Sequence, residues 1–366
     1  MKILYFDCVY YPGHLGFDSS IISCLAESAE EMVVIQPDNW FSVNVNTIRY
    51  INRGIPKRKT KRFGRFITWK ISVLNVLHSL PIIRKEKPDV VIIGEYELLT
   101  FSFVFPLLYF YCKRIVIIHH NNIDQLTHSR IKRILFSLYK NRVYSCVLEP
   151  FIKEYLEHKY EIAEDHVICW PHPIKGAPSK LDINSMKKYS VIGISNSNDE
   201  ELIANIIELE KELNVFKNNQ IRIILKSKTT EYDDGYLTII NGWISDDEYN
   251  DYYNNAHSVF VAFPSSYQYR VSATLLDAIK RKTPIIGSDS MMMDYYHSAY
   301  PNICKIYNPQ TFIDDIKAYS IIDETMEGEF NRFMRSHSNE YIINQIKNDL
   351  FNITNSKLVN EDKYAD

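Results

Sequence analysis

The sequence has 366 residues, 46% of them hydrophobic and 24% charged, which is close to the globular average. This composition excludes a disordered chain, a collagen-like repeat and a long coiled coil. With 42 Lys and Arg against 45 Asp and Glu, the net charge is −3, so no overall basic excess points to nucleic acid. At about 150 residues per domain, the length predicts two domains.

The first half of the chain predicts strands alternating with helices. Apolar runs rich in Ile and Val mark strands at 2–8, 32–36, 87–94, 114–119 and 144–148. The loop YYPGHLGFD follows the first strand, and we expect Asp18 to cap a helix that ends near Ala29. Strands that are apolar on both faces are typical of parallel sheets covered by helices, which favours right-handed βαβ connections.

Prolines between 171 and 178 interrupt this pattern, which then restarts. Strands are predicted at 189–194, 220–225, 236–240, 258–263 and 284–287, and helices at 198–213, 246–256 and 272–281. The sequence therefore predicts two similar α/β domains, each a doubly wound parallel sheet, joined near residue 175. The cleft between two such domains is the expected ligand site.

The six cysteines are scattered through apolar segments and form no C-x-x-C pair. Reduced thiols in a cytoplasmic protein are the simplest interpretation, and a zinc site is not expected. The first residues, MKILYFDCVYY, lack the apolar core of a signal peptide.

The strongest signal is the strand, loop, helix and strand of SVFVAFPSSYQYRVSATLLDAIKRKTPIIGSD. A helix opening at Ser272 would leave the N–H groups of Ala273 and Thr274 free for an anion, with the guanidinium of Arg270 beside them. Asp277, one turn further on, could accept hydrogen bonds from both hydroxyls of a ribose. The alternative is that Ser272 only caps the helix and Asp277 is a solvated acid.

This segment resembles the nucleotide-sugar-binding signature of GT-B glycosyltransferases, especially the group 1 or family 4 type. Asp277 matches the second glutamate of the family's E-x7-E motif, which holds the donor ribose, but the first glutamate falls at Tyr269 and is absent. That departure leaves a retaining outcome open. The stretch 240–265 also resembles the family pattern, and we count its Trp243 among the donor-binding residues.

The resemblance extends to about residue 310 and implies further donor contacts. RKEKPDVVIIG resembles an N-terminal strand of the family, and Gly16 matches the first of two glycines that approach the donor diphosphate, although Phe17 replaces the second. The family's cation pair after the first strand of the second domain is missing from GISNSNDEEL. Arg270 and Lys226 are our substitutes, although a lysine at a strand end is usually solvated.

Glycosyl transfer builds negative charge on the leaving diphosphate, which helix N–H groups and Arg270 could stabilise without a metal. The acidic pairs 233–234 and 246–247 lack D-x-D spacing, so we predict neither a metal nor a cofactor. An inverting enzyme needs a general base. The candidates are His119, Asp18 and His14, with His120 beside them; His119 is preferred because it ends a predicted parallel strand, where the resemblance implies a histidine.

A basic segment with interleaved aromatics, 53–70, predicts a peripheral membrane surface, with a solvated loop or a nucleic-acid site as alternatives. A second basic stretch spans 130–142, and the uncharged run 98–112 is too short for a membrane span and fits a buried or membrane-facing helix. The predicted patch comprises Lys57, Arg58, Lys59, Lys61, Arg62, Arg65 and Trp69.

Together these features predict a GT-B glycosyltransferase. The resemblance implies an acceptor-binding domain at 1–175, to which 346–366 returns, and a nucleotide-sugar-binding domain at 176–345. We expect a metal-independent enzyme that transfers a sugar from a nucleotide-sugar donor, UDP-linked as the commonest case, to a lipid-linked or oligosaccharide acceptor of a bacterial surface polysaccharide. It would lie in the cytoplasm, peripheral to the membrane. A non-catalytic GT-B subunit that binds a partner glycosyltransferase or a glycan is the main alternative, and a sugar-nucleotide epimerase is a third.

Overall fold

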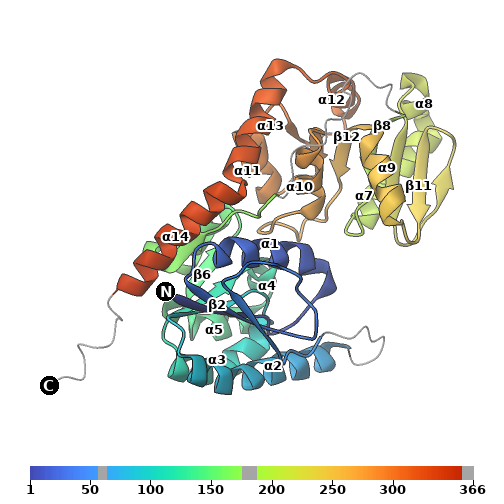
Figure 1. Cartoon of the computed structure of the whole chain (residues 1–366). Helices are drawn as coiled ribbons and strands as arrows, with labels where there is room; N and C mark the ends of the chain where they lie inside the picture. The colour runs from blue at the N-terminus through green and yellow to red at the C-terminus, as the bar shows by residue number, and fades with distance from the viewer. Residues whose placement is uncertain (57–63, 175–187, 357–366) are drawn as a thin grey trace. The chain divides into compact units, whose positions relative to one another are not determined.

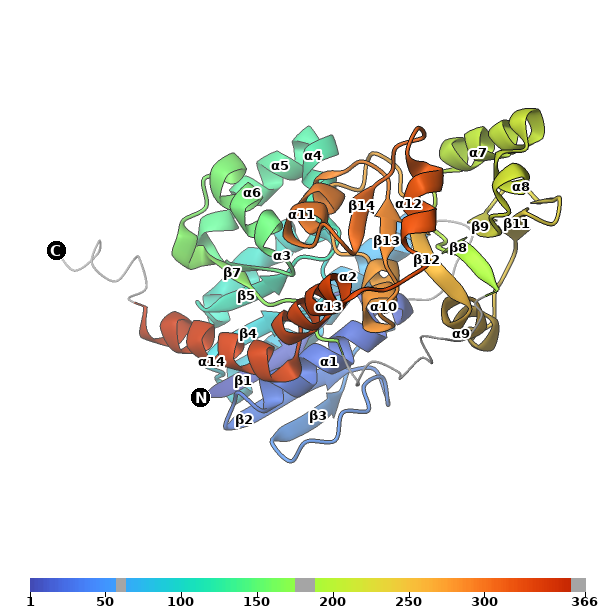
Figure 2. The same cartoon turned by 90° about the horizontal axis from the view of Figure 1, so that it is seen from above.

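The computed structural model describes residues 1–56, 64–174 and 188–356. The chain divides into two compact units (Figures 1 and 2). Unit 1 comprises Met1–Lys175 and His337–Asp366, and unit 2 comprises Gly176–Ser336. Each unit is built around its own seven-stranded sheet.

The sheet of unit 1 has the strand order β3-β2-β1-β4-β5-β6-β7, and every neighbouring pair is parallel. The sequence did not predict β3, because its side chains are half exposed, or β7, which has only three residues. The strands are β1 (Lys2–Phe6), β2 (Glu31–Gln36), β3 (Ile48–Asn52), β4 (Val90–Ile93), β5 (Ile115–Ile118), β6 (Tyr144–Val147) and β7 (Val167–Cys169).

Helices cover this sheet on both faces, with α1 on one side and α2 and α3 on the other (Figure 1). They are α1 (Leu15–Ala26), α2 (Gly64–Glu86), α3 (Leu98–Tyr111), α4 (Asn122–His128), α5 (Arg130–Ser137), α6 (Pro150–Tyr160) and α14 (Asn339–Asn355), with the short 3-10 turns η1 (Pro12–His14), η2 (Lys140–Arg142) and η3 (Glu164–His166). Because α1 begins at Leu15, Asp18 lies inside the helix and does not cap it, which corrects our prediction.

Helix α2 is, by length and composition, apolar enough to cross a membrane, and one side of it packs against α3 in unit 1. Its buried stripe carries polar groups that bond to protein. Ser72 pairs with Thr100 of α3 at 2.9 Å, and the Asn75 side chain donates to the backbone oxygens of Cys8 and Ile55. Asn75 therefore ties α2 to the loop that follows β1.

The sheet of unit 2 has the order β10-β11-β9-β8-β12-β13-β14, parallel except for the β10–β11 pair. Its strands are β8 (Tyr189–Gly193), β9 (Ile223–Ser227), β10 (Tyr232–Asp233), β11 (Leu237–Asn241), β12 (Ala256–Val261), β13 (Ile285–Gly287) and β14 (Cys304–Ile306). Its helices are α7 (Glu200–Leu213), α8 (Val215–Asn219), α9 (Asp246–Asn254), α10 (Ala273–Lys280), α11 (Met291–Ala299), α12 (Phe312–Ala318) and α13 (Glu324–Ser336). Two mainly parallel, doubly wound sheets confirm the predicted fold class.

The chain returns to unit 1 through α14, which packs against α1. The Trp170 indole N–H donates to Asp349 at 2.8 Å, and His337 pairs with Glu149 at 2.9 Å. From the sequence, we predicted this return at residue 346. The structure sets it at His337, because the buried contact with Glu149 already belongs to unit 1.

Candidate active site

In unit 1, three loops meet at the carboxyl edge of the sheet where the strand order reverses. From β1 the chain continues to β2 on one side, whereas β4 lies on the other side of β1, with β5 beyond it. Such a switch point is where open α/β sheets bind ligands, because the loops diverge there. The loops after β1, β4 and β5 bring His14, Glu95 and His120 to this point.

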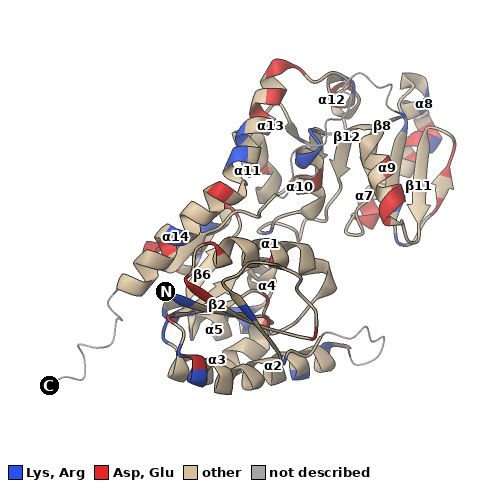
Figure 3. Cartoon of the chain, viewed as in Figure 1, with Lys and Arg blue, Asp and Glu red and all other residues tan. Residues whose placement is uncertain are grey.

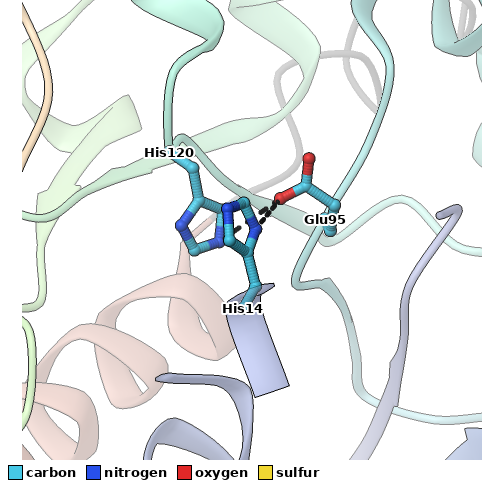
Figure 4. A group of neighbouring side chains, drawn as sticks. All are labelled: His14, Glu95 and His120. Carbon is cyan, nitrogen blue, oxygen red and sulfur yellow. Dashed lines mark hydrogen bonds and ion pairs between the residues drawn. The ribbon is translucent and has the colours of Figure 1, made fainter. Parts of the chain in front are cut away.

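Two histidines share the carboxylate of Glu95 (Figure 4). Nδ1 of His14 lies 2.6 Å from Glu95 Oε2, and Nε2 of His120 lies 3.7 Å from the same oxygen. The two imidazole rings stack with centroids 4.4 Å apart. A carboxylate only accepts hydrogen bonds, so Nδ1 of His14 is the donor, and in a neutral ring the lone pair is left on Nε2. This arrangement gives His14 the form of an oriented base.

The backbone around this group is fixed. The amide N–H of Glu95 donates to Asp7 Oδ1 at 3.0 Å, and His120 Nε2 lies 3.0 Å from the carbonyl oxygen of Gly94. Burial, together with the neighbouring His14 and His172, lowers the pKa of His120 well below its usual value. His120 is therefore neutral at neutral pH and donates to Gly94.

Two predicted catalytic residues are buried instead. His119 is 1% exposed, its Nδ1 lies 2.9 Å from the Tyr96 hydroxyl, and burial lowers its pKa to about 3. Asp18 is fully buried and accepts from the Tyr5 hydroxyl at 3.3 Å; burial, then the charges of Asp7 and Glu95, raise its pKa. Neither side chain is open to a substrate hydroxyl in this arrangement, whereas the His14 side chain is 24% exposed.

The same three side chains are the part of the described chain that could hold a metal. Their ligand atoms all lie within 4.8 Å of one another, and imidazole nitrogen with carboxylate oxygen suits a transition ion. The hydrogen bond between His14 and Glu95 already engages two of the three atoms. The sequence offered no sign of this cluster, because its members are far apart in the chain.

In unit 2 the strand order reverses between β8 and β12, and the predicted donor residues follow neighbouring strands along the carboxyl edge. Trp243 follows β11 and is 83% exposed, so an aromatic face is open to solvent. Lys226 lies near the end of β9 and is 5% exposed. Its carbonyl oxygen accepts from Asn198, which follows β8 and was not predicted.

The ammonium group of Lys226 has no hydrogen bond or ion pair with any residue that the structure describes. Burial lowers its pKa. Nearby, the side-chain oxygen of Asn198 is buried without a hydrogen-bond partner in the described part of the chain. The stem of Lys226 is buried while its ammonium group keeps contact with water. The ammonium is therefore available to an anion, and the alternative of a solvated lysine stays open beside that role.

The start of α10 is as the sequence predicted. Ser272 is the N-cap, and its hydroxyl oxygen accepts from the amide of Leu275 at 3.2 Å. The first two helical amides, of Ala273 and Thr274, have no acceptor within the helix. The guanidinium of Arg270 stacks on the ring of Tyr267 at 3.5 Å, in the loop that leads to the helix. The structure thus confirms the cap and leaves an anion-binding role compatible with it.

Asp277 is held by two neighbours. Its Oδ2 accepts from the Tyr249 hydroxyl of α9 at 3.0 Å, and its Oδ1 lies 3.8 Å from the Arg281 guanidinium. The side chain is still 42% exposed. Asp277 is therefore not merely a solvated acid, and it keeps an accessible edge for a ligand.

Gly16 lies in the first turn of α1, where a Cβ atom would meet nothing within 4 Å. The space above its backbone is open, as an approach by a ligand requires. Of the predicted membrane patch, Arg65 and Trp69 lie on α2. The remaining members, Lys57, Arg58, Lys59, Lys61 and Arg62, lie outside the described residues.

The paired sheets and their switch points define the class of protein: the chain has the GT-B glycosyltransferase fold. A glycosyltransferase from Rickettsia africae is similar in structure, with a TM-score of 0.58 and 12% sequence identity; the match covers 97% of this chain and 99% of the glycosyltransferase. The α,α-trehalose 6-phosphate synthase of Burkholderia multivorans has a TM-score of 0.63 and 11% identity, and the match covers 96% of this chain and 98% of the synthase. The Anabaena protein HepE, solved in complex with UDP-glucose, has a TM-score of 0.60 and 11% identity, and the match covers 96% of this chain and 99% of HepE.

No protein-family model matches the sequence, and no curated protein matches it significantly. The similarity therefore lies in the fold. The particular reaction has to be argued from the residues at the two sheet edges.

Proposed function

We propose that the protein is a glycosyltransferase, of the group 1 or family 4 type, that moves a sugar from a nucleotide-sugar donor to a hydroxyl of a lipid-linked or oligosaccharide acceptor. A UDP-sugar is the first donor to test, and bacterial surface polysaccharide is the proposed product. The observation that carries the proposal is the row of Trp243, Lys226 and the start of α10 along one sheet edge of a GT-B fold.

Each member of this row suits one part of a nucleotide-sugar. The exposed ring of Trp243 can stack on the base, since base–aromatic stacking needs only an open face. The ammonium of Lys226, the guanidinium of Arg270 and the first amides of α10 can neutralise a diphosphate. The accessible edge of Asp277 can accept from the ribose hydroxyls.

Unit 1 supplies the base. Nε2 of His14 would take the proton of the acceptor hydroxyl while Glu95 holds the ring through Nδ1. The hydroxyl oxygen forms a bond to the anomeric carbon as the carbon–oxygen bond to the diphosphate breaks, and the diphosphate leaves with the electron pair. Attack by an activated hydroxyl on the face opposite the leaving group gives inversion, and the glutamate missing at Tyr269 agrees with that outcome.

The leaving diphosphate can be stabilised by protein donors, so we propose a metal-independent, hexosyltransferase-like reaction. The acceptor class fits a protein that works in the cytoplasm at the membrane surface. Arg65 and Trp69 on α2 are the described members of the predicted seven-residue patch that would contact the membrane.

The first test is calorimetric titration of the protein with UDP, GDP, ADP and CMP. We expect one nucleotide to bind with a micromolar Kd. Asp277→Ala should weaken binding, whereas Asp314→Ala, an exposed acid on α12 of the same unit, should not. If no nucleotide binds, the donor site is refuted and the non-catalytic GT-B subunit becomes the better interpretation.

The second test separates binding from chemistry. With the donor sugar identified, His14→Ala should bind nucleotide as the wild type does but lose transfer to acceptor. His158→Ala, which changes an exposed histidine on α6, is the matched control. Full transfer by His14→Ala would refute the assignment of the base.

A further inference from the structure

The cluster of His14, Glu95 and His120 brings metal-ligating atoms together on loops that follow three neighbouring strands of unit 1. One ligand atom from each residue lies within 4.8 Å of the other two. Figure 4 shows Nδ1 of His14 and Nε2 of His120 facing the same carboxylate oxygen of Glu95. Because the two rings are stacked, these nitrogens converge on the space beside that oxygen.

The spacing of these atoms is close to what a tetrahedral ion needs. Zn²⁺ binds imidazole nitrogen and carboxylate oxygen at about 2.0–2.2 Å, which sets neighbouring donor atoms about 3.3 Å apart. Nε2 of His120 lies 3.7 Å from Oε2 of Glu95. Nδ1 of His14 lies 2.6 Å from the same oxygen because a hydrogen bond joins them, so an ion that replaces this bond has to part the pair by about 0.7 Å. Rotation of the two side chains can supply a shift of that size.

The cluster is open to an ion from solvent, yet its rings are held in place. The side chains of His14, Glu95 and His120 are 24%, 13% and 10% exposed. The edge of the Phe17 ring packs against His120 with centroids 4.7 Å apart, and Tyr11 packs in the same way against His14 at 5.3 Å. An ion can therefore enter without unfolding the loops, and water can occupy its remaining coordination positions.

The charges around the cluster favour a cation. Among the described residues, no Lys or Arg pairs with the carboxylate of Glu95. A second carboxyl group, that of Asp7, lies beside it and accepts the backbone N–H of Glu95 at 3.0 Å. The helices that follow the three loops, α1, α3 and α4, contain no Lys or Arg, and α1 is drawn without blue in Figure 3. A divalent ion would balance this local negative charge.

We propose that His14, Glu95 and His120 bind a divalent transition ion, with Zn²⁺ as the first to test, and that the bound ion switches off sugar transfer. Two imidazole nitrogens with one carboxylate oxygen are a donor set that suits Zn²⁺ and its neighbours in the transition series. Mg²⁺ prefers oxygen donors in octahedral geometry, so it should not occupy this cluster.

The effect on transfer follows from the single proton of a neutral imidazole, and it rests on the proposed function. As the proposed base, His14 keeps this proton on Nδ1, donates it to Glu95 and leaves Nε2 free to accept a proton. An ion bound through Nδ1 needs the lone pair of that nitrogen, so the ring proton moves to Nε2. The ring cannot hold the ion and act as the base at once. The reaction is therefore metal-independent, and the ion inhibits it.

The first test is calorimetric titration of the untagged full chain, freed of metal by a chelator, with ZnCl₂. We expect one ion per chain with a micromolar or lower Kd, a higher Tm in the presence of Zn²⁺, and no binding of MgCl₂. His120→Ala and Glu95→Gln should each weaken Zn²⁺ binding at least about tenfold, since even an outer partner of a ligand contributes that much. His158→Ala, which changes an exposed histidine on α6, should bind Zn²⁺ as the wild type does.

A spectroscopic measurement keeps this test independent of small changes in stability. Co²⁺ in place of Zn²⁺ should give a visible absorption that excess Zn²⁺ removes and that His120→Ala lacks. Circular dichroism checks that each variant is folded. Absence of Zn²⁺ binding, or binding that His120→Ala and Glu95→Gln leave unchanged, would overturn the site and leave the cluster as a hydrogen-bonded group. This titration needs no sugar donor, so it decides the site even if the proposed reaction fails.

The second test measures transfer once the donor is identified. Zn²⁺ should abolish transfer by the wild type at the concentrations that fill the site, and a chelator should restore it. Binding of the nucleotide should stay as it was, because the donor residues lie in unit 2. Transfer that continues with the site filled, or transfer that requires Zn²⁺, would refute the inhibitory role.

Discussion

Replacing Lys226 by methionine should change stability and nucleotide binding in opposite directions. Methionine keeps the length of the side chain and removes its charge. In the wild type the side chain is 5% exposed as a whole and its ammonium has no partner among the described residues, so folding removes part of the water around the ammonium without compensation. If the Lys226 ammonium serves to bind a diphosphate, its removal stabilises the free protein and weakens the binding of nucleotide.

The stability gain is bounded by the cost of a buried unsatisfied donor, about 1–3 kcal/mol, because the ammonium keeps part of its water. For a unit of this size, each kcal/mol moves Tm by about 2–4 °C, so Lys226→Met should raise the Tm of the free protein by up to roughly 12 °C. A charge-assisted hydrogen bond to phosphate is worth about 1.5–3 kcal/mol, so the nucleotide Kd should rise about 10- to 150-fold.

The pH dependence gives an independent check. Burial lowers the pKa of Lys226, so the folded state binds its proton less well than the unfolded state does. The charged lysine lowers the free energy of unfolding by its full amount at pH values below its pKa in the folded state. This destabilisation disappears above the usual pKa of 10.5, where the unfolded lysine has also lost its proton. The advantage of Lys226→Met should therefore be largest at neutral pH and shrink as the pH rises towards 10.5.

The assays are thermal denaturation and calorimetric titration of the free protein, with Lys228→Met as the control. Lys228 lies two positions on and is exposed, so its substitution should change neither quantity. Lower stability in Lys226→Met, or nucleotide binding equal to that of the wild type, would refute the reasoning.

Three further predictions concern other positions. Trp243→Ala should raise the nucleotide Kd about 5- to 150-fold, since stacking is worth about 1–3 kcal/mol, while Tm stays constant because the ring is exposed; an unchanged Kd would exclude stacking there. Asp18→Asn should stabilise unit 1 by about 1–3 kcal/mol at neutral pH, because a carboxyl group whose pKa is raised by folding destabilises the folded state at pH values above its usual pKa of 3.8. Urea denaturation should show this gain at neutral pH and no gain below about pH 4. Burial lowers the pKa of His119 to about 3, so the free energy of unfolding falls as the pH drops below 6.5, by about 2 kcal/mol at pH 5. His119→Gln should remove that part of the loss at acid pH. If the free energy of unfolding of the variant fell with pH as steeply as that of the wild type, the proposed effect of burying His119 would be refuted.

Local rules explain what the sequence predicted well. The strands that are apolar on both faces were found, because continuous runs of Ile and Val have few other uses in a parallel sheet. The cap at Ser272 was also predicted correctly, since a capping hydroxyl needs only an amide three residues away. A similar local pattern and a family resemblance placed Lys226 and Trp243 at strand ends and Arg270 in the loop before α10.

The sequence could not separate the candidate bases His119 and His120, because neighbouring residues at a strand end point in opposite directions. His119 and His120 are adjacent, yet His119 turns towards Tyr96 inside the domain and His120 towards Gly94 and Glu95. Side chains alternate between the two faces along a strand, but once the strand has ended the sequence does not say which of the two neighbours faces inward. The prediction for Asp18 failed because Asp is common at helix N-caps, whereas α1 begins at Leu15 and Asp18 lies in its first turn.

By itself, the sequence determined two doubly wound α/β units, the strand ends that carry donor candidates, and the helix that starts at Ser272, because periodicity and capping act over a few residues. Only the tertiary structure decided that His14, Glu95 and His120 meet, since β1, β4 and β5 are neighbours in the sheet but far apart in the chain. It also decided which apolar side chains of α3 and α5 stay exposed, because the exposed side of an apolar helix is defined only by which other side packs against the domain.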